Sequence, residues 1–133
     1  MAIQPRLEKS LFDAETHKKI VDFIKSEAYL VEHDPHEFKR TGAHNIPFFK
    51  YIHHQLTDLA CEIFGEKVKP TYVYTSLYGN EGICPLHTDR PQCKYTIDYC
   101  IDQDQTWDIY VDGKPYTLEA NDALCYSGTD SPH

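Results

Sequence analysis

The stretch KPTYVYTSLYGN, residues 69–80, decides the fold class, because its pattern of side chains differs from that of the chain before it. Tyr72, Tyr74, Ser76 and Tyr78 recur at every second position, which places them on one face of a β-strand. The Gly-Asn pair at 79–80 then ends the strand. The pattern predicts that the chain changes from helices to strands near residue 70.

Two amphipathic helices are predicted before this strand. The first covers residues 13–26, follows an N-cap at Ser10, and repeats its apolar residues at helical spacing. The second begins at Asn45 and Pro47 and ends at Gly65, a residue type typical of helix C-termini. The segment between them, residues 31–44, is polar and irregular and predicts a surface loop.

Short strands are predicted after residue 80. They cover residues 83–89, 94–101, 107–111, 114–118 and 123–126. Asp112-Gly113 predicts a hairpin between the third and fourth of these, and Asn121-Asp122 predicts a turn before the last. Helices followed by strands indicate an α+β fold in one domain, residues 1–133. We expect a helical layer over 1–66 and a sandwich or barrel over 67–133.

The composition excludes several classes of function. The chain has 133 residues and a net charge of −8, which argues against a nucleic-acid partner. It has no apolar run of about 18 residues and no apolar core of a signal peptide, so we expect no membrane partner. Five cysteines, an odd number without a Cys-x-x-Cys motif, indicate reduced thiols and a cytoplasmic protein.

The tripeptide His87-Thr88-Asp89 is the one His-x-Asp sequence in the chain. Residues two apart on a strand point to the same side, so one imidazole and one carboxylate would project together. His133 follows several more strands and could complete a set of three ligands. Two histidines and one carboxylate suit non-haem Fe(II), and zinc could occupy the same ligands. Taken alone, a His-x-Asp sequence is more often a hydrogen-bonded surface pair.

Two segments together resemble the 2-oxoglutarate/Fe(II)-dependent oxygenases of the prolyl-4-hydroxylase-like group. Residues 78–91, YGNEGICPLHTDRP, resemble the family's strand, glycine-containing turn and His-x-Asp. Residues 118–133, LEANDALCYSGTDSPH, resemble its turn, apolar strand, small-residue turn and distal histidine. The resemblance covers about half of the chain. It implies N-terminal helices packed on a double-stranded β-helix, a jelly-roll barrel.

The resemblance also implies roles for individual residues. His87, Asp89 and His133 would be the ligands of Fe(II), with 2-oxoglutarate and O2 as co-substrates. Tyr78 would bind the distal carboxylate of 2-oxoglutarate, although ordinary strand packing explains a tyrosine there equally well. Because Asp89 is a carboxylate, the site resembles that of a hydroxylase rather than that of a halogenase. No catalytic residue beyond the metal ligands is implied.

One departure from the family concerns the end of the chain. Family members carry an Arg or Lys on the strand after the distal histidine, whereas this sequence ends at His133, so we expect the last barrel strand to be missing from this chain. Arg90 is expected to serve the turn or the substrate side. Arg40, with His33 and His36, lies in the loop at 31–44, which could cover a substrate or could simply be a polar surface loop.

Three hypotheses of different class remain open. The first is a dioxygenase that hydroxylates a small-molecule or peptide substrate. The second is a non-catalytic module that binds a metal or a small molecule on the same scaffold. The third is an interaction domain in which the His-x-Asp sequence is incidental. Neither the substrate nor the oligomeric state is indicated by the residues.

Overall fold

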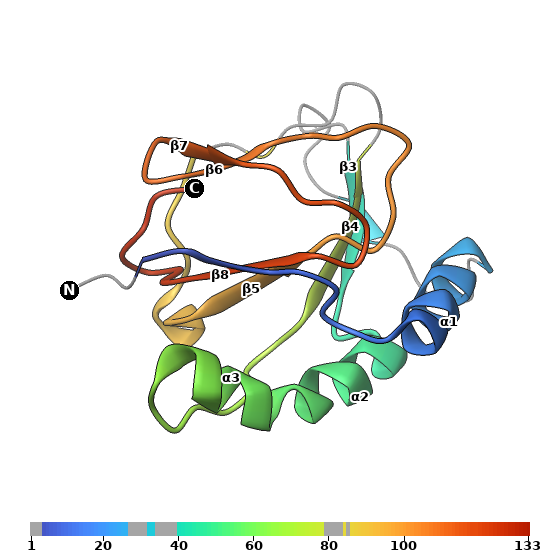
Figure 1. The fold of residues 1–133 in the computed structure, drawn as a ribbon, viewed down its shortest axis with the longest axis horizontal. Helices are drawn as coiled ribbons and strands as arrows, with labels where there is room; N and C mark the ends of the chain where they lie inside the picture. Colours follow the sequence, from blue (N-terminus) through green and yellow to red (C-terminus); the bar gives the residue numbers. More distant parts are fainter. Residues whose placement is uncertain (1–3, 27–31, 34–39, 79–83, 85) are drawn as a thin grey trace. The chain divides into compact units, whose positions relative to one another are not determined.

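Contacts divide the chain into two compact units, each described by itself below. The structure is a computed structural model, and it describes residues 4–26, 32–33, 40–78, 84 and 86–133. The first unit combines Met1–Ala28 with Leu86–His133, and the second unit is Tyr29–Pro85. Figure 1 traces the helices and strands that make up the two units.

The described residues form three α-helices and several antiparallel strands, which confirms the α+β class. The helices are α1 (Ala14–Lys25), α2 (Pro47–Gln55) and α3 (Thr57–Phe64). The strands are β1 (Arg6–Glu8), β2 (Glu32–His33), β3 (Arg40–His44), β4 (Tyr74–Tyr78), β5 (Thr96–Tyr99), β6 (Ile109–Val111), β7 (Lys114–Tyr116) and β8 (Ala123–Tyr126). Within these residues they form separate small sheets and no closed barrel, so the jelly-roll barrel stays a prediction.

The first unit is built on a three-stranded sheet in the order β1-β8-β5. Figure 1 shows these strands side by side, with β8 in the middle. Leu7 on β1 and Asp98 on β5 both lie opposite Leu124, one on each side of β8. Thr96 on β5 lies opposite Tyr126. Paired residues point to the same face of an antiparallel sheet. Leu7, Leu124, Tyr126, Thr96 and Asp98 therefore share one face.

That face packs against the hairpin of β6 and β7. Leu124 and Tyr126 are fully buried and form a core cluster with Val111 and Leu118. The turn of the hairpin has positive φ at both Asp112 and Gly113, 53° and 77°, as the predicted tight turn requires. The hairpin prediction is confirmed, and two layers enclose the core of this unit.

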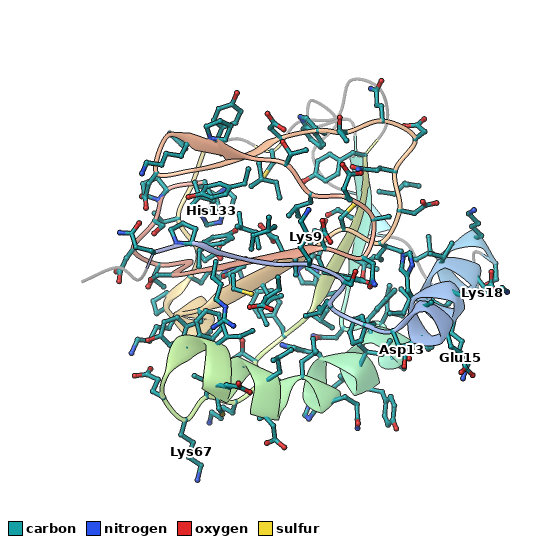
Figure 2. The ribbon with its side chains drawn as sticks, in the orientation of Figure 1. Lys9, Asp13, Glu15, Lys18, Lys67 and His133 are labelled. Carbon is teal, nitrogen blue, oxygen red and sulfur yellow. The ribbon has the colours of Figure 1, made fainter. Side chains whose placement is uncertain are left out.

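Helix α1 begins one turn later than the predicted N-cap. Asp13, and not Ser10, is the N-cap, and its carboxylate accepts a hydrogen bond of 2.7 Å from the Thr16 amide. Ser10 has a positive φ of 50° and precedes the helix. Lys18, labelled in Figure 2, pairs with Asp22 on the exposed face of the helix at 2.8 Å. The predicted range of the helix, 13–26, agrees with the observed caps.

The second unit corrects two predictions. Residues 40–44 are not loop: β3 pairs along its whole length with β4, in a sheet ordered β2-β3-β4. The single helix predicted up to Gly65 is divided at Leu56, where ψ is −1°. The Thr57 hydroxyl donates a hydrogen bond of 2.8 Å to the His54 carbonyl at this break, a side-chain contact that competes with helical continuation.

Candidate metal centre

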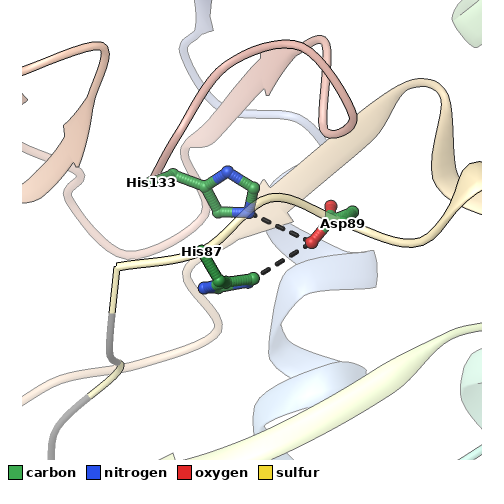
Figure 3. Close-up of side chains that lie close together, drawn as sticks. All are labelled: His87, Asp89 and His133. Atoms are coloured by element: carbon green, nitrogen blue, oxygen red, sulfur yellow. Dashed lines mark hydrogen bonds and ion pairs between the residues drawn. The ribbon is translucent and has the colours of Figure 1, made fainter.

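His87, Asp89 and His133 lie together in the first unit. Their potential ligand atoms are all within 4.8 Å of one another. Figure 3 shows both imidazoles directed at the same carboxylate oxygen, Asp89 Oδ1. The Nε2 atom of His87 lies 3.3 Å from this oxygen, and Nε2 of His133 lies 3.1 Å from it. The structure thus brings together the three residues that the sequence singled out as metal ligands.

The backbone that carries the three side chains differs from the prediction. No strand is assigned at residue 84 or at residues 86–89, so the predicted strand over 83–89 is wrong for these residues. His87 and His133 instead exchange two backbone hydrogen bonds of 2.9 Å, the arrangement of one antiparallel residue pair. The Asp89 amide donates to the Gly128 carbonyl at 2.7 Å. Backbone hydrogen bonds therefore hold the His-x-Asp segment against the C-terminal turn.

The two oxygens of Asp89 have different partners. Oδ2 accepts a hydrogen bond of 2.6 Å from the Thr96 hydroxyl, while Oδ1 faces the histidines. Partial burial would raise the pKa of Asp89, but the hydrogen bonds from His133 and Thr96 and the charges of the two histidines hold it below its ordinary value. Asp89 is therefore an anion at neutral pH.

His133 is held by its other ring nitrogen. Nδ1 lies 2.7 Å from the Ser131 carbonyl, which can only accept, so Nδ1 carries a hydrogen and donates it. Nε2 can then contact Asp89 Oδ1 favourably in two ways: as a protonated nitrogen, or with a metal ion between them. Burial would lower the pKa of His133, yet its hydrogen bonds to Asp89 and Ser131 raise it above the ordinary value. The geometry thus calls for a cation, either a proton or a metal.

Exposure differs across the three side chains. The His133 side chain is 7% exposed and that of Asp89 16%, whereas the His87 side chain is 43% exposed. The Tyr126 ring covers His133, with ring centroids 4.7 Å apart. Solvent and ligands therefore reach the cluster from the side of His87.

Gly128 makes room for the site. A Cβ atom built at this position would overlap Asp89 Oδ2 and Thr96 Oγ1 and would lie 2.8 Å from the Cys93 carbonyl oxygen. Because a real side-chain carbon almost never approaches so closely, any other residue would have to displace the carboxylate or the backbone. The small residue after β8 is thus required by the position of Asp89.

The two separations from the histidine nitrogens to Asp89 Oδ1 fit a metal ion. At a metal–ligand distance of about 2.1 Å, ligand atoms lie about 3.0 Å apart at octahedral angles and about 3.4 Å apart at tetrahedral angles. The two measured distances to Asp89 Oδ1, 3.3 and 3.1 Å, fall in this range. The donor set and the hydrogen bond at His133 Nδ1 are also those of metal-binding histidines in proteins. The residues present therefore fit a divalent cation.

Other residues expected at the site are placed as follows. Tyr78 and Arg40 are cross-strand partners in the second unit. The structure therefore places these two residues relative to each other, but it does not place them relative to the triad. Arg90 is exposed and precedes the short 3-10 turn Pro91–Cys93, consistent with the expected role in the turn. His33 lies in β2, and His36 is outside the described residues.

Sequence reasoning missed the residues that support the ligands. Thr96 was assigned to a strand without a role, and neither Gly128 nor the Ser131 carbonyl was expected at the site. Asp98 was missed as well: it is half-buried, its carboxylate accepts a hydrogen bond of 2.6 Å from the Tyr126 hydroxyl, and burial raises its pKa. A signal for Thr96 and Asp98 existed in their spacing, since residues two apart on a strand share a face.

No protein-family model, no curated protein and no solved structure matches this chain. Among the described residues, no helix combines the length and the apolar character needed to cross a membrane. Function is therefore inferred from the residues and the geometry of the first unit.

Proposed function

We propose that this chain is a non-haem Fe(II), 2-oxoglutarate-dependent dioxygenase that hydroxylates a small molecule or a peptide. The observation that carries the proposal is the convergence of His87, Asp89 and His133, whose ligand atoms lie within 4.8 Å of one another. Two histidines and a carboxylate on one side of an iron ion leave positions for a co-substrate and for O2. The resemblance of residues 78–91 and 118–133 to this oxygenase family supports the same function.

The proposal includes a jelly-roll fold. In its support, the sheet β1-β8-β5 packs against the hairpin β6-β7 through a shared core, and all described strand pairs of this unit are antiparallel. Facing antiparallel layers are the building plan of double-sheet jelly rolls.

The chain's own residues would bind, orient and shield the metal. Asp89 supplies the negative charge, and the Ser131 carbonyl fixes the ring of His133 so that Nε2 points at the cluster. Buried Tyr126 keeps water from one side, while exposed His87 marks the side from which co-substrate and substrate enter. Fe(II) with 2-oxoglutarate and O2 supplies an oxidation that yields succinate, CO2 and a hydroxylated substrate. Arg90, in the same unit as the triad, is proposed to bind the substrate, and the roles expected of Tyr78 and Arg40 stay predictions.

Anaerobic addition of Fe(II) and 2-oxoglutarate tests the proposal. The wild-type chain should develop a weak visible charge-transfer band, and admission of O2 should release succinate. Asp89→Ala should abolish both signals. Asp108→Ala is the matched control, because Asp108 is an exposed aspartate that also accepts a 2.6 Å hydrogen bond from a threonine, Thr117. A wild-type chain without the band and without succinate would overturn the proposal.

The second candidate is a non-catalytic site for zinc. The observation in its favour is that 3.3 and 3.1 Å lie between octahedral and tetrahedral ligand separations, so the same three residues could bind Zn(II) with water as a fourth ligand. Tight zinc binding that excludes Fe(II), with no succinate formed at saturating iron, would favour this candidate over the dioxygenase.

A further inference from the structure

The second oxygen of Asp89 has a partner of its own. Thr96, on β5, donates its hydroxyl hydrogen to Asp89 Oδ2 at 2.6 Å, a short distance typical of hydrogen bonds to an ionised carboxylate. The other oxygen, Oδ1, faces both histidines. A carboxylate can bind a metal through one oxygen or through both. Which of the two occurs here depends on whether Oδ2 is available.

We propose that Thr96 is a positioning residue that makes Asp89 a one-oxygen ligand and so keeps a coordination position open. This inference rests on the proposed metal site. With one oxygen from Asp89 and one nitrogen from each histidine, an octahedral ion has three positions left. If Asp89 bound through both oxygens, only two would remain. A chelating keto acid takes two positions, so the third is the one left for O2.

The surroundings of Thr96 restrict its hydroxyl. Thr96 pairs with Tyr126 in the β5–β8 ladder, so its backbone is fixed by the central strand of the sheet. Its side chain is branched at Cβ and has few accessible rotamers. Gly128 lies against both atoms of the hydrogen bond, since a Cβ there would overlap Thr96 Oγ1 and Asp89 Oδ2. The hydroxyl and the carboxylate oxygen therefore share a closely packed space.

The chain contains the same hydrogen bond in a place without histidines. Thr117 donates to Asp108 Oδ1, also at 2.6 Å, between two exposed residues. Removing the Thr117 hydroxyl changes the same type of contact but leaves the cluster intact. Thr117→Val is therefore the matched control for Thr96→Val.

Cobalt(II) is the probe, because its visible spectrum reports the number and geometry of its ligands. We would titrate wild type, Thr96→Val, Thr96→Ser and Thr117→Val with Co(II) against a chromophoric chelator, and then add 2-oxoglutarate to each cobalt-loaded chain. Thr96→Val should change the cobalt spectrum and weaken Co(II) or 2-oxoglutarate binding about 10- to 100-fold, the usual loss when a residue that orients a ligand is removed. Thr96→Ser, which keeps a hydroxyl, and Thr117→Val should behave as wild type.

The outcomes separate this inference from the proposed function. If wild type binds Co(II) and Thr96→Val matches it in spectrum and in both affinities, the role of Thr96 is refuted while the metal site stands. If wild type binds no Co(II), the metal site itself is refuted, and the inference with it. The melting temperature of each metal-free variant checks folding, and Thr96→Ala removes the same hydroxyl if Thr96→Val does not fold.

Discussion

Asp122 and Asp89 lie near opposite ends of β8, and their carboxylates have different kinds of hydrogen-bond partner. Asp122 directly precedes the strand, and its side chain is 5% exposed. It accepts hydrogen bonds from the Ser10 amide and the Glu119 amide, both at 3.1 Å, and from the Lys9 ammonium at 3.0 Å. Figure 2 labels Lys9 on the segment after β1. All three donors keep their hydrogens at ordinary pH, so the charge of Asp122 is fully compensated within the chain.

Asp89 lies beyond the other end of β8, against Gly128, and is compensated only in part. Thr96 satisfies Oδ2, but the partners of Oδ1 are two imidazoles, which donate to it only when their Nε2 atoms are protonated. A partly buried anion whose second oxygen faces only titratable donors is unfavourable unless a proton or another cation joins it. The difference is that Asp122 is neutralised by amide and ammonium donors of the fold, whereas Asp89 Oδ1 faces two imidazoles, the arrangement from which we propose a metal site.

The largest expected effect is the loss of metal binding in Asp89→Asn. The amide keeps the size of the side chain and removes its charge, so metal affinity should fall at least about 100-fold, more than the usual loss on removing a residue that only orients a ligand. Asp122→Asn should leave metal affinity unchanged. Competition with a chromophoric chelator measures both, and equal losses in the two variants would contradict the distinction drawn between the two carboxylates.

In Asp122→Ala we expect a loss of stability rather than a loss of metal binding. The substitution removes the acceptor of the Ser10 and Glu119 amides, and a hydrogen bond to a charged group contributes about 1.5–3 kcal/mol. The free energy of unfolding should fall by about 3 kcal/mol in urea titrations. Asp108→Ala, at an exposed position, should change it by less than about 0.5 kcal/mol. A similar value for both variants would mean that Asp122 does not anchor the first unit.

Gly128→Ala should affect the site and the stability together. The added methyl group must displace Asp89, Thr96 or the Cys93 carbonyl, and such overpacking destabilises by about 1–3 kcal/mol. Metal affinity should fall with it. Gly113→Ala is the control: it has open space around it but a φ of 77°, so it should destabilise by about 1 kcal/mol without loss of metal affinity. If Gly128→Ala kept full metal affinity, the carboxylate would not need the space at Gly128.

Part of this arrangement could be predicted from the sequence. The Asp112-Gly113 hairpin and the strand after Asn121-Asp122 follow from local turn chemistry, which the neighbouring residues fix. The pairing of His87 with Asp89 was predicted from their spacing, and His133 was added from the resemblance of residues 118–133 to the oxygenase family. The predicted cause of the pairing was wrong in one respect, since backbone hydrogen bonds to the C-terminal turn, and not a strand over 83–89, hold the His-x-Asp segment.

The rest depends on contacts that the local sequence does not encode. Thr96 reaches Asp89 because β5 and β8 pair in one particular register, and sequence patterns do not specify which residues of two strands stand opposite each other. Strand β3 was missed because residues 40–44, RTGAH, have weak strand propensity and acquire their conformation by pairing with β4. The break at Leu56 was missed because no Gly or Pro marks it.

The smallest expected effects are opposite pH dependences for Asp122 and Asp98 in the metal-free chain. Burial would raise the pKa of Asp122, but hydrogen bonds from Ser10, Lys9 and Glu119 hold it below 3.8; burial raises that of Asp98 above 3.8. The stabilisation by ionised Asp122 is present above pH 3.8 and is lost as pH falls through the lowered pKa. Asp98 binds its proton more tightly in the folded state, so stability decreases as pH rises from 3.8 towards the raised pKa.

Urea titrations of wild type, Asp122→Asn and Asp98→Asn across this range of pH measure the two effects. The stability of wild type relative to Asp122→Asn should increase with pH and level off above 3.8, the ordinary value for an aspartate. Relative to Asp98→Asn it should decrease with pH, because the asparagine stays neutral when the aspartate ionises. If both stability differences changed with pH in the same direction, Asp98 and Asp122 would have pKa values shifted in the same direction, and the prediction would be wrong. Opposite slopes would mean that compensation by amide and ammonium donors, and not burial alone, determines which carboxylates of this unit carry charge.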